Sequence, residues 1–241
     1  MKKLFAIFAL ISLSVAAMAQ SNTGSESDSE SDSYAPVNSI YASEGGVFSV
    51  GLLSRMGYGF YFVDTQDYTP QKLGSGEFFV NLVQFHFRPA EAFGVDLGTD
   101  FMVRHFNSVD EAFYQTSDGY IKAGTNVLPT GAQDIHSNFN TFGVNFPLTL
   151  NAYFGDFKVG VGAELGLNFA AETEYRYRNA RRRVSVSEDK AKVNTLTYDF
   201  VAQVSYDYLG VFFKFYPKTM HILPSPSVDQ SFFALGIQIG F

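Results

Sequence analysis

Residues 145–169 read NFPLTLNAYFGDFKVGVGAELGLNF, two alternating runs that meet at a Gly-Asp pair. Successive side chains of a β-strand point to opposite faces, so each run has one apolar face and one face of polar residues and glycine. In the second run, Val159, Val161, Ala163, Leu165, Leu167 and Phe169 alternate with Lys158, Gly160, Gly162, Glu164, Gly166 and Asn168. The stretch therefore predicts an antiparallel β-hairpin with its turn at Gly155 and Asp156.

Alternation of the same kind continues on both sides of this hairpin. It predicts eight strands, over residues 47–63, 78–88, 93–106, 139–154, 157–170, 195–208, 209–217 and 231–241. The predicted connections are short after the second, fourth and sixth strands, and long at residues 64–77, 107–138, 171–194 and 218–230. An even number of antiparallel strands with short turns at one end and long loops at the other is typical of outer-membrane barrels.

The second predicted strand is irregular. Its apolar face is predicted to hold Phe79, Val83, Phe85 and Phe87, and Asn81 interrupts that face. The opposite face is predicted to carry Gln84, His86 and Arg88.

The composition of the two faces distinguishes a membrane barrel from a soluble one. The polar positions carry mainly Gly, Asn, Thr and Ser, whereas a water-exposed surface is usually rich in Lys and Glu. Rows of Phe, Tyr, Val and Leu facing water would form a large adhesive patch, but facing lipid they form the expected coat. We therefore predict an all-β fold, an eight-stranded antiparallel transmembrane β-barrel of up-and-down topology with short periplasmic turns and long extracellular loops.

The N-terminal segments are predicted to lie outside the barrel. Residues 1–19 carry two lysines, an apolar run and Ala17-Met18-Ala19, which is the pattern of a cleaved signal peptide. The apolar run is shorter than a membrane-spanning helix requires. Residues 20–45 begin with an acidic, serine-rich stretch that predicts a disordered linker, and the barrel is predicted over residues 46–241.

Composition also excludes several partners and cofactors. The chain contains 0 Cys, which rules out disulfides, thiolate metal sites and a lipoprotein anchor. Its formal net charge of −7 argues against a nucleic-acid partner, because such partners usually require a basic surface. No motif predicts a cofactor or a metal, and the pattern determines neither a ligand nor an oligomeric state.

The last ten residues read FFALGIQIGF and end in Phe241. This ending resembles the C-terminal strand of outer-membrane barrels, and the resemblance implies that Phe241 is an assembly signal read by the barrel-assembly machinery. Residues 145–169 resemble the central hairpin of the PorT-like family of small outer-membrane barrels. The resemblance implies a barrel of the OmpA or OmpX type without a periplasmic domain, located in the bacterial outer membrane.

The polar faces predict a set of charges inside the barrel. Its members are Arg55, Asp96, Asp100, Arg104, Lys158, Glu164, Asp199 and Lys214. An eight-stranded barrel is just wide enough for its own side chains, and buried charges must be paired. A structural plug of ion pairs is therefore the favoured interpretation, and a path for ions or protons is the alternative.

One predicted outer loop is rich in arginine. Arg176, Arg178, Arg181, Arg182 and Arg183 lie within eight residues. Guanidinium groups bind phosphate in bidentate fashion, so the loop predicts contact with outer-membrane lipid and lipopolysaccharide phosphates. The alternative is a solvated hairpin in which Glu172, Glu174, Glu188 and Asp189 neutralise the arginines.

Three functions remain open from the sequence. The preferred one is a non-enzymatic outer-membrane protein that supports membrane integrity, surface adhesion or assembly. A narrow channel for ions or small solutes is the second. An outer-membrane hydrolase is the third, and His136 and His221 are the loop histidines that it would require.

Overall fold

The computed structural model describes residues 39–42, 47–63, 75–109, 111–180, 182–189, 191–217 and 232–240. The predicted signal peptide, most of the predicted linker, Arg181, His221 and Phe241 lie outside these residues. The chain divides into two units, residues 1–34 and 35–241, and the second unit holds everything described below. Among the described residues, no helix is long and apolar enough to cross a bilayer.

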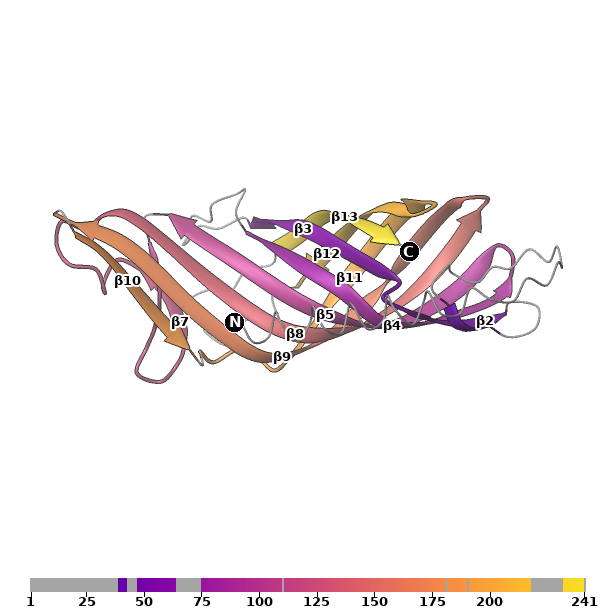
Figure 1. The fold of residues 1–241 in the computed structure, drawn as a ribbon, viewed down its shortest axis with the longest axis horizontal. Coiled ribbons are helices and arrows are strands. Elements are labelled where there is room, and N and C mark those ends of the chain that lie inside the picture. The colour runs from indigo at the N-terminus through magenta and orange to yellow at the C-terminus, as the bar shows by residue number, and fades with distance from the viewer. Residues whose placement is uncertain are drawn as a thin grey trace. The chain divides into compact units, whose positions relative to one another are not determined.

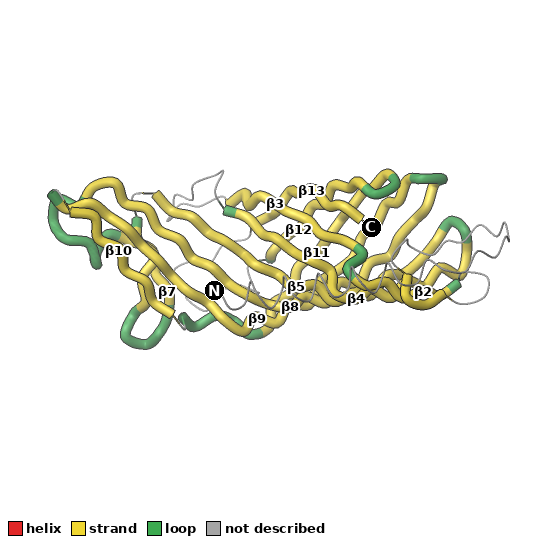
Figure 2. Tube along the Cα trace, viewed as in Figure 1, coloured by secondary structure: helices red, strands yellow, loops and turns green. Residues whose placement is uncertain are grey.

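Every regular element that the structure describes is a strand (Figures 1 and 2). The elements are β1 (Ser39–Ala42), β2 (Phe48–Leu52), β3 (Arg55–Val63), β4 (Gly76–Ala90), β5 (Phe93–Val109), β6 (Ala112–Gln115), β7 (Ile121–Gly124), β8 (Gln133–Phe154), β9 (Phe157–Asn179), β10 (Arg182–Asp189), β11 (Leu196–Tyr206), β12 (Leu209–Tyr216) and β13 (Phe232–Gly240). β1 lies within the segment predicted as a linker, and it pairs with β2.

The strands close into a ring. β2 and β3 pair with different parts of β4 and form one interrupted strand, with a break at Leu53, whose φ is 49°. The remaining neighbours follow chain order through β5, β8, β9, β11, β12 and β13, and the ring closes where β13 pairs with β3 from Phe232 opposite Val63 to Gly240 opposite Arg55. This ring of eight antiparallel strands is a β-barrel, so the predicted strand number and up-and-down order are confirmed.

Apolar side chains cover the outside of the ring, and polar side chains fill its inside. Val161 and Ile237 are 56% and 57% exposed, whereas Asp100 and Glu164 are 0% and 1% exposed. We call the outward rows the apolar band. It includes Met56, Tyr58, Phe60, Phe78, Phe85, Phe93, Leu97, Leu148, Leu150, Val161, Leu165, Phe200, Val204, Val211, Phe213, Leu235 and Ile237.

The face predicted for Phe79 was wrong. The pairing of β4 with β5 shifts register between Asn81 and Val83, which leaves Leu82 as an extra residue. Such a bulge reverses the direction of the side chains that lie beyond it. Phe78 therefore points outward while Phe79 and Asn81 are buried inside the ring, and Asn81 does not interrupt the apolar face.

β8 and β9 continue well past the predicted ends of their strands. Much of the connection predicted over residues 171–194 is strand, because β9 runs to Asn179 and turns at Ala180 into β10. We call residues 133–141 of β8, residues 171–179 of β9 and β10 the extension, which lies at the left in Figure 1. Within the connection predicted over residues 107–138, β6 and β7 form a hairpin. Its Phe113 and Ile121 pack against Phe139 and Ala171 of the extension.

Candidate functional site

The centre of the barrel interior is a buried lysine between two glutamates. Lys214 Nζ on β12 lies 3.0 Å from Glu77 Oε1 on β4 and 2.8 Å from Glu164 Oε2 on β9. Glu164 also accepts a hydrogen bond from Asn145 Nδ2 at 2.9 Å. Glu77 accepts hydrogen bonds from the hydroxyl groups of Tyr61 and Tyr216. Three strands that are distant in sequence are thereby tied together across the lumen.

A second ion pair lies toward the turn end. Arg55 Nη2 on β3 is 2.7 Å from Asp100 Oδ2 on β5, and Asn81 Nδ2 donates to Asp100 Oδ1 at 2.7 Å. Ser54, at the break between β2 and β3, donates to Asn81 Oδ1 at 2.8 Å. The bulge in β4 turns Asn81 into the lumen, and the break before β3 does the same for Ser54. Both irregularities therefore bring hydrogen-bonding side chains to the Arg55–Asp100 pair.

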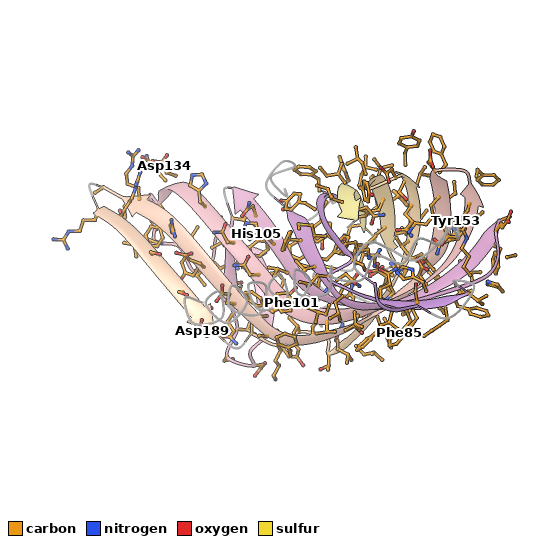
Figure 3. The ribbon with its side chains drawn as sticks, turned by 45° about the vertical axis from the view of Figure 1, so that its right-hand side comes forward. Phe85, Phe101, His105, Asp134, Tyr153 and Asp189 are labelled. Carbon is orange, nitrogen blue, oxygen red and sulfur yellow. The ribbon has the colours of Figure 1, made fainter. Side chains whose placement is uncertain are left out.

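Asp96 forms the third group, nearest the short turns. Its carboxylate is 2.9 Å from His86 Nδ1 and 3.7 Å from Lys158 Nζ. Arg88 lies above the ring of Tyr153 at 3.9 Å from its centroid. Figure 3 shows Tyr153 at this end of the sheet, opposite the end that carries Asp134.

The two other predicted charges, Arg104 and Asp199, are buried but not joined in an ion pair within the described residues. Arg104 donates to Asn168 Oδ1 at 2.8 Å and to Asn145 Oδ1 at 3.3 Å. Asp199 stands opposite Glu164 in the ladder between β11 and β9, and neither of its oxygens has a hydrogen-bond partner among the described residues. All eight predicted charges thus belong to the inner face, and six of them, with Glu77 and His86, join three ion-pair groups that we call the lumen network.

Sequence reasoning missed the aromatic part of the interior. Phe79 and Phe212 are 1% and 2% exposed, with ring centroids 5.5 Å apart, and Lys214 Nζ lies 5.0 Å from the first ring and 5.5 Å from the second. Each of these residues is next to another Phe in the sequence, at Phe78-Phe79 and at Phe212-Phe213. The residue types alone therefore do not show which of the two rings points inward. Gly236 leaves room for Phe212, because a Cβ added there would lie 2.4 Å from Phe212 Cζ. Tyr61 and Tyr216 stack with Phe106 and Phe232 above this level.

The predicted arginine loop is largely a β-hairpin. Arg176 Nη2 lies 2.7 Å from Glu174 Oε1, and Arg178 Nη2 lies 3.0 Å from Asp134 Oδ2. Hydrogen bonds from Arg176 and Ser185 hold the pKa of Glu174 below its ordinary value, against a smaller opposing effect of partial burial. Arg182 and Arg183 are exposed on β10. The structure therefore supplies an acidic partner for two of the predicted arginines.

Other chemistry has little support in the described residues. They contain no group of His, Asp and Glu that could hold a metal ion. His136, predicted in a loop, is an exposed residue of β8 instead. His221 lies outside the described residues, so the arrangement predicted for a hydrolase stays a prediction.

Comparison with known proteins adds little to this geometry. No protein-family model and no curated protein sequence matches the chain. Two solved structures of Ail, the attachment invasion locus protein of Yersinia pestis, resemble it weakly. One of them, in complex with the heparin analogue sucrose octasulfate, has a TM-score of 0.35 and 12% identity over 80% of this chain and 97% of that one. The other has a TM-score of 0.34 and 11% identity over the same shares. At this similarity the fold assignment rests on the closed ring, and the PorT-like resemblance stays a prediction.

Proposed function

We propose that the chain is a non-enzymatic β-barrel protein of the bacterial outer membrane, with a sealed lumen and an extension that forms its working surface. The observation that carries this proposal is the apolar band, which encircles the ring while the charges lie inside. Rows of exposed Phe, Leu, Ile and Val on all eight strands are stable against hydrocarbon and unfavourable against water.

The height of the band fits a bilayer. On β8 the outward apolar positions run from Phe142 to Phe154, and on β5 from Phe93 to Val103. With a rise of about 3.4 Å per residue and a tilt of about 40°, these rows span roughly 25–30 Å. Phe154, Phe157, Tyr206 and Tyr208, all more than half exposed, stand at the turn end, where membrane barrels carry an aromatic girdle.

The outer face changes character where the band ends. Beyond Val103, Phe142 and Ala170, the next outward residues are His105, Asn140 and Glu172, and His105 and Asn140 are hydrogen-bonded to each other. In the extension the apolar residues Phe139 and Ala171 face inward instead. This inversion supports a water-exposed extension above a lipid-exposed band.

Depth-dependent fluorescence quenching tests the proposal. The chain contains 0 Trp, so a single introduced Trp is an unambiguous reporter. We expect Leu148→Trp, at the middle of the band, to be quenched by lipids brominated in their acyl chains, and His136→Trp, in the extension, to remain unquenched. Equal quenching of the two variants in folded protein would rule out the membrane assignment.

The lumen network and the aromatic residues beside it favour a closed lumen rather than an ion-conducting channel. Arg104, Lys214, Phe79 and Phe212 fill the interior at 0–2% exposure. We expect no conductance steps for the wild-type protein in planar bilayers, and steps to appear in the double variant Phe79→Ala, Phe212→Ala. Discrete openings of the wild-type protein would favour the channel instead.

Lipopolysaccharide contact by the arginines stays a prediction, and the fold restricts it. Arg176 and Arg178 lie six and eight residues beyond Ala170, which places them roughly 15–20 Å above the band. Phosphates at the headgroup layer are therefore out of reach, and only phosphates further from the bilayer remain as ligands. An assembly role for Phe241 also stays a prediction.

A further inference from the structure

β10 is the outermost strand of the extension. It pairs with β9 along its whole length, from Arg182 opposite Asn179 to Asp189 opposite Glu172. No other strand in the described part of the chain pairs with it. Backbone groups of successive residues point to alternate edges of a strand, so a row of N–H and C=O groups faces away from β9. Such an edge is a template for pairing with another strand.

The outward-facing residues of β10, which are Arg183, Ser185, Ser187 and Asp189, are complementary to themselves when the strand is reversed. In an antiparallel pair of two β10 strands centred on Val186, Arg183 of each copy stands opposite Asp189 of the other. Ser185 stands opposite Ser187, and every side chain keeps to its own face. In a parallel pair in register, Arg183 would face Arg183, and like charges opposite each other are destabilising. The charge pattern therefore selects the antiparallel arrangement.

The two charged residues that this pairing uses, Arg183 and Asp189, form no ion pair with other described residues of their own chain. Arg183 stands opposite Arg178 in the ladder, and the guanidinium of Arg178 is taken by Asp134. Within the described residues, neither Arg183 nor Asp189 has an ion-pair partner, and both are exposed. By contrast, Glu188 on the inner face accepts a hydrogen bond from the backbone of Gln115 at 2.6 Å. One exposed cation and one exposed anion thus share the outer face of β10, six residues apart.

We propose that β10 pairs antiparallel with β10 of a second copy in an opposing membrane, so that the extension joins two surfaces that both carry the protein. This inference rests on the proposed function, because insertion of the barrel in a membrane fixes the direction in which each β10 strand runs. Two copies in one membrane are related by an axis along its normal, so both β10 strands run toward the same bilayer. With strands tilted by about 35–45°, they would cross at roughly 70–90°. Only copies on facing membranes can lie antiparallel.

Vesicle clustering tests the charge pattern. The wild-type protein, reconstituted into phosphatidylcholine vesicles, is expected to cluster them, as followed by light scattering. Arg183→Asp and Asp189→Arg each place like charges opposite each other, and each is expected to slow clustering about tenfold. Mixing vesicles of the two variants restores both opposite-charge pairs and should restore the rate. Failure of folded, inserted wild-type protein to cluster vesicles would overturn the proposal and leave the barrel assignment intact.

Disulfide trapping in detergent tests the pairing without a membrane. Since the native chain has 0 Cys, a single introduced Cys reports on one position. Val186 lies on the two-fold axis of the proposed pair, and Val184, on the same face of the same strand, lies about 13 Å from its own copy. We expect Val186→Cys to form at least about ten times more disulfide dimer than Val184→Cys, given the short reach of a disulfide. Equal yields from the two variants, or no dimer from either, would refute the register.

Discussion

β8 and β9 each run through two regions that are built in opposite ways. In the band, their outward faces carry Leu148 and Leu165, and their inward faces carry Asn145 and Glu164. In the extension, the outward face is polar, and the inward face packs Phe139 against the β6–β7 hairpin. Figure 3 places Asp134 and Asp189 in the second region, away from Phe85 in the first. The same two strands therefore follow an inside-out rule where we infer lipid and the ordinary rule where we infer water.

Electrostatic contacts differ between the two regions in the same way. Lys214 and its two glutamates are 2% exposed or less, whereas Arg178 and Asp134 are 49% and 59% exposed. Removing one partner of a buried pair leaves a charge without compensation, whereas an exposed pair is screened by water. The comparison between the regions is therefore testable by single substitutions.

Removing the central lysine should have the largest effect. Lys214→Met leaves Glu77 and Glu164 buried without a cation, and we expect it to lower the free energy of unfolding by about 3–5 kcal/mol. Urea titration of the refolded protein in lipid vesicles measures the change. The matched variant in the extension, Arg178→Ser, should change it by less than about 1 kcal/mol. A similar loss in both variants would mean that the lumen network is not shielded from water.

A charge placed on the band should come second. Leu148 stands near the middle of the outward row on β8. We expect Leu148→Arg to lower the free energy of unfolding by about 2–4 kcal/mol. Asn138→Arg, on the outer face of the same strand in the extension and opposite Glu174 in the ladder, should be neutral. Equilibrium refolding into vesicles supplies both values. If the two substitutions prove equivalent, the outer face has one environment rather than two.

A larger side chain at a crowded position inside the ring should lower the free energy of unfolding somewhat less than a charge on the band does. A Cβ added at Gly236 would lie 2.3 Å from the carbonyl oxygen of Tyr58 and 2.4 Å from Phe212 Cζ, so Gly236→Ala is expected to destabilise by about 1–3 kcal/mol. At Gly240, on the same strand, the nearest atoms are 3.7 and 3.8 Å away, and Gly240→Ala should be tolerated. A mild Gly236→Ala phenotype would indicate that Phe212 moves easily and that the seal is loose.

The smallest effect should be a pH dependence confined to the extension. Because the pKa of Glu174 is depressed in the folded state, its contacts with Arg176 and Ser185 stabilise β10 above the unfolded pKa of about 4.3. That contribution is lost as the pH falls through the lower, folded-state pKa. We expect β10 amides to lose hydrogen-exchange protection between pH 5 and pH 3, after correction for intrinsic rates. Glu174→Gln should abolish the change, and an unchanged pH dependence in that variant would assign it to another group.

The residues differ in how far sequence could place them. Asp100 and Glu164 were placed on the inner face correctly, because regular alternation reports the face of a strand. Glu77 was missed, since it precedes the bulge in β4 and fell in a predicted connection. Phe79 was placed on the wrong face for the same reason. The bulge is stabilised by Asn81, Asp100 and Ser54 from three different segments, which no local pattern contains.

The sequence by itself determined the number of strands in the ring, their antiparallel order and, where alternation is regular, which residues share a face of a strand. Those properties follow from a period of two and from turn residues, and both are local. Only the tertiary structure decided that Lys214 lies between Glu77 and Glu164, that β8 and β9 extend past the band, and that β10 has an open edge. These features depend on register between strands and on bulges, which are set by contacts between residues far apart in the chain.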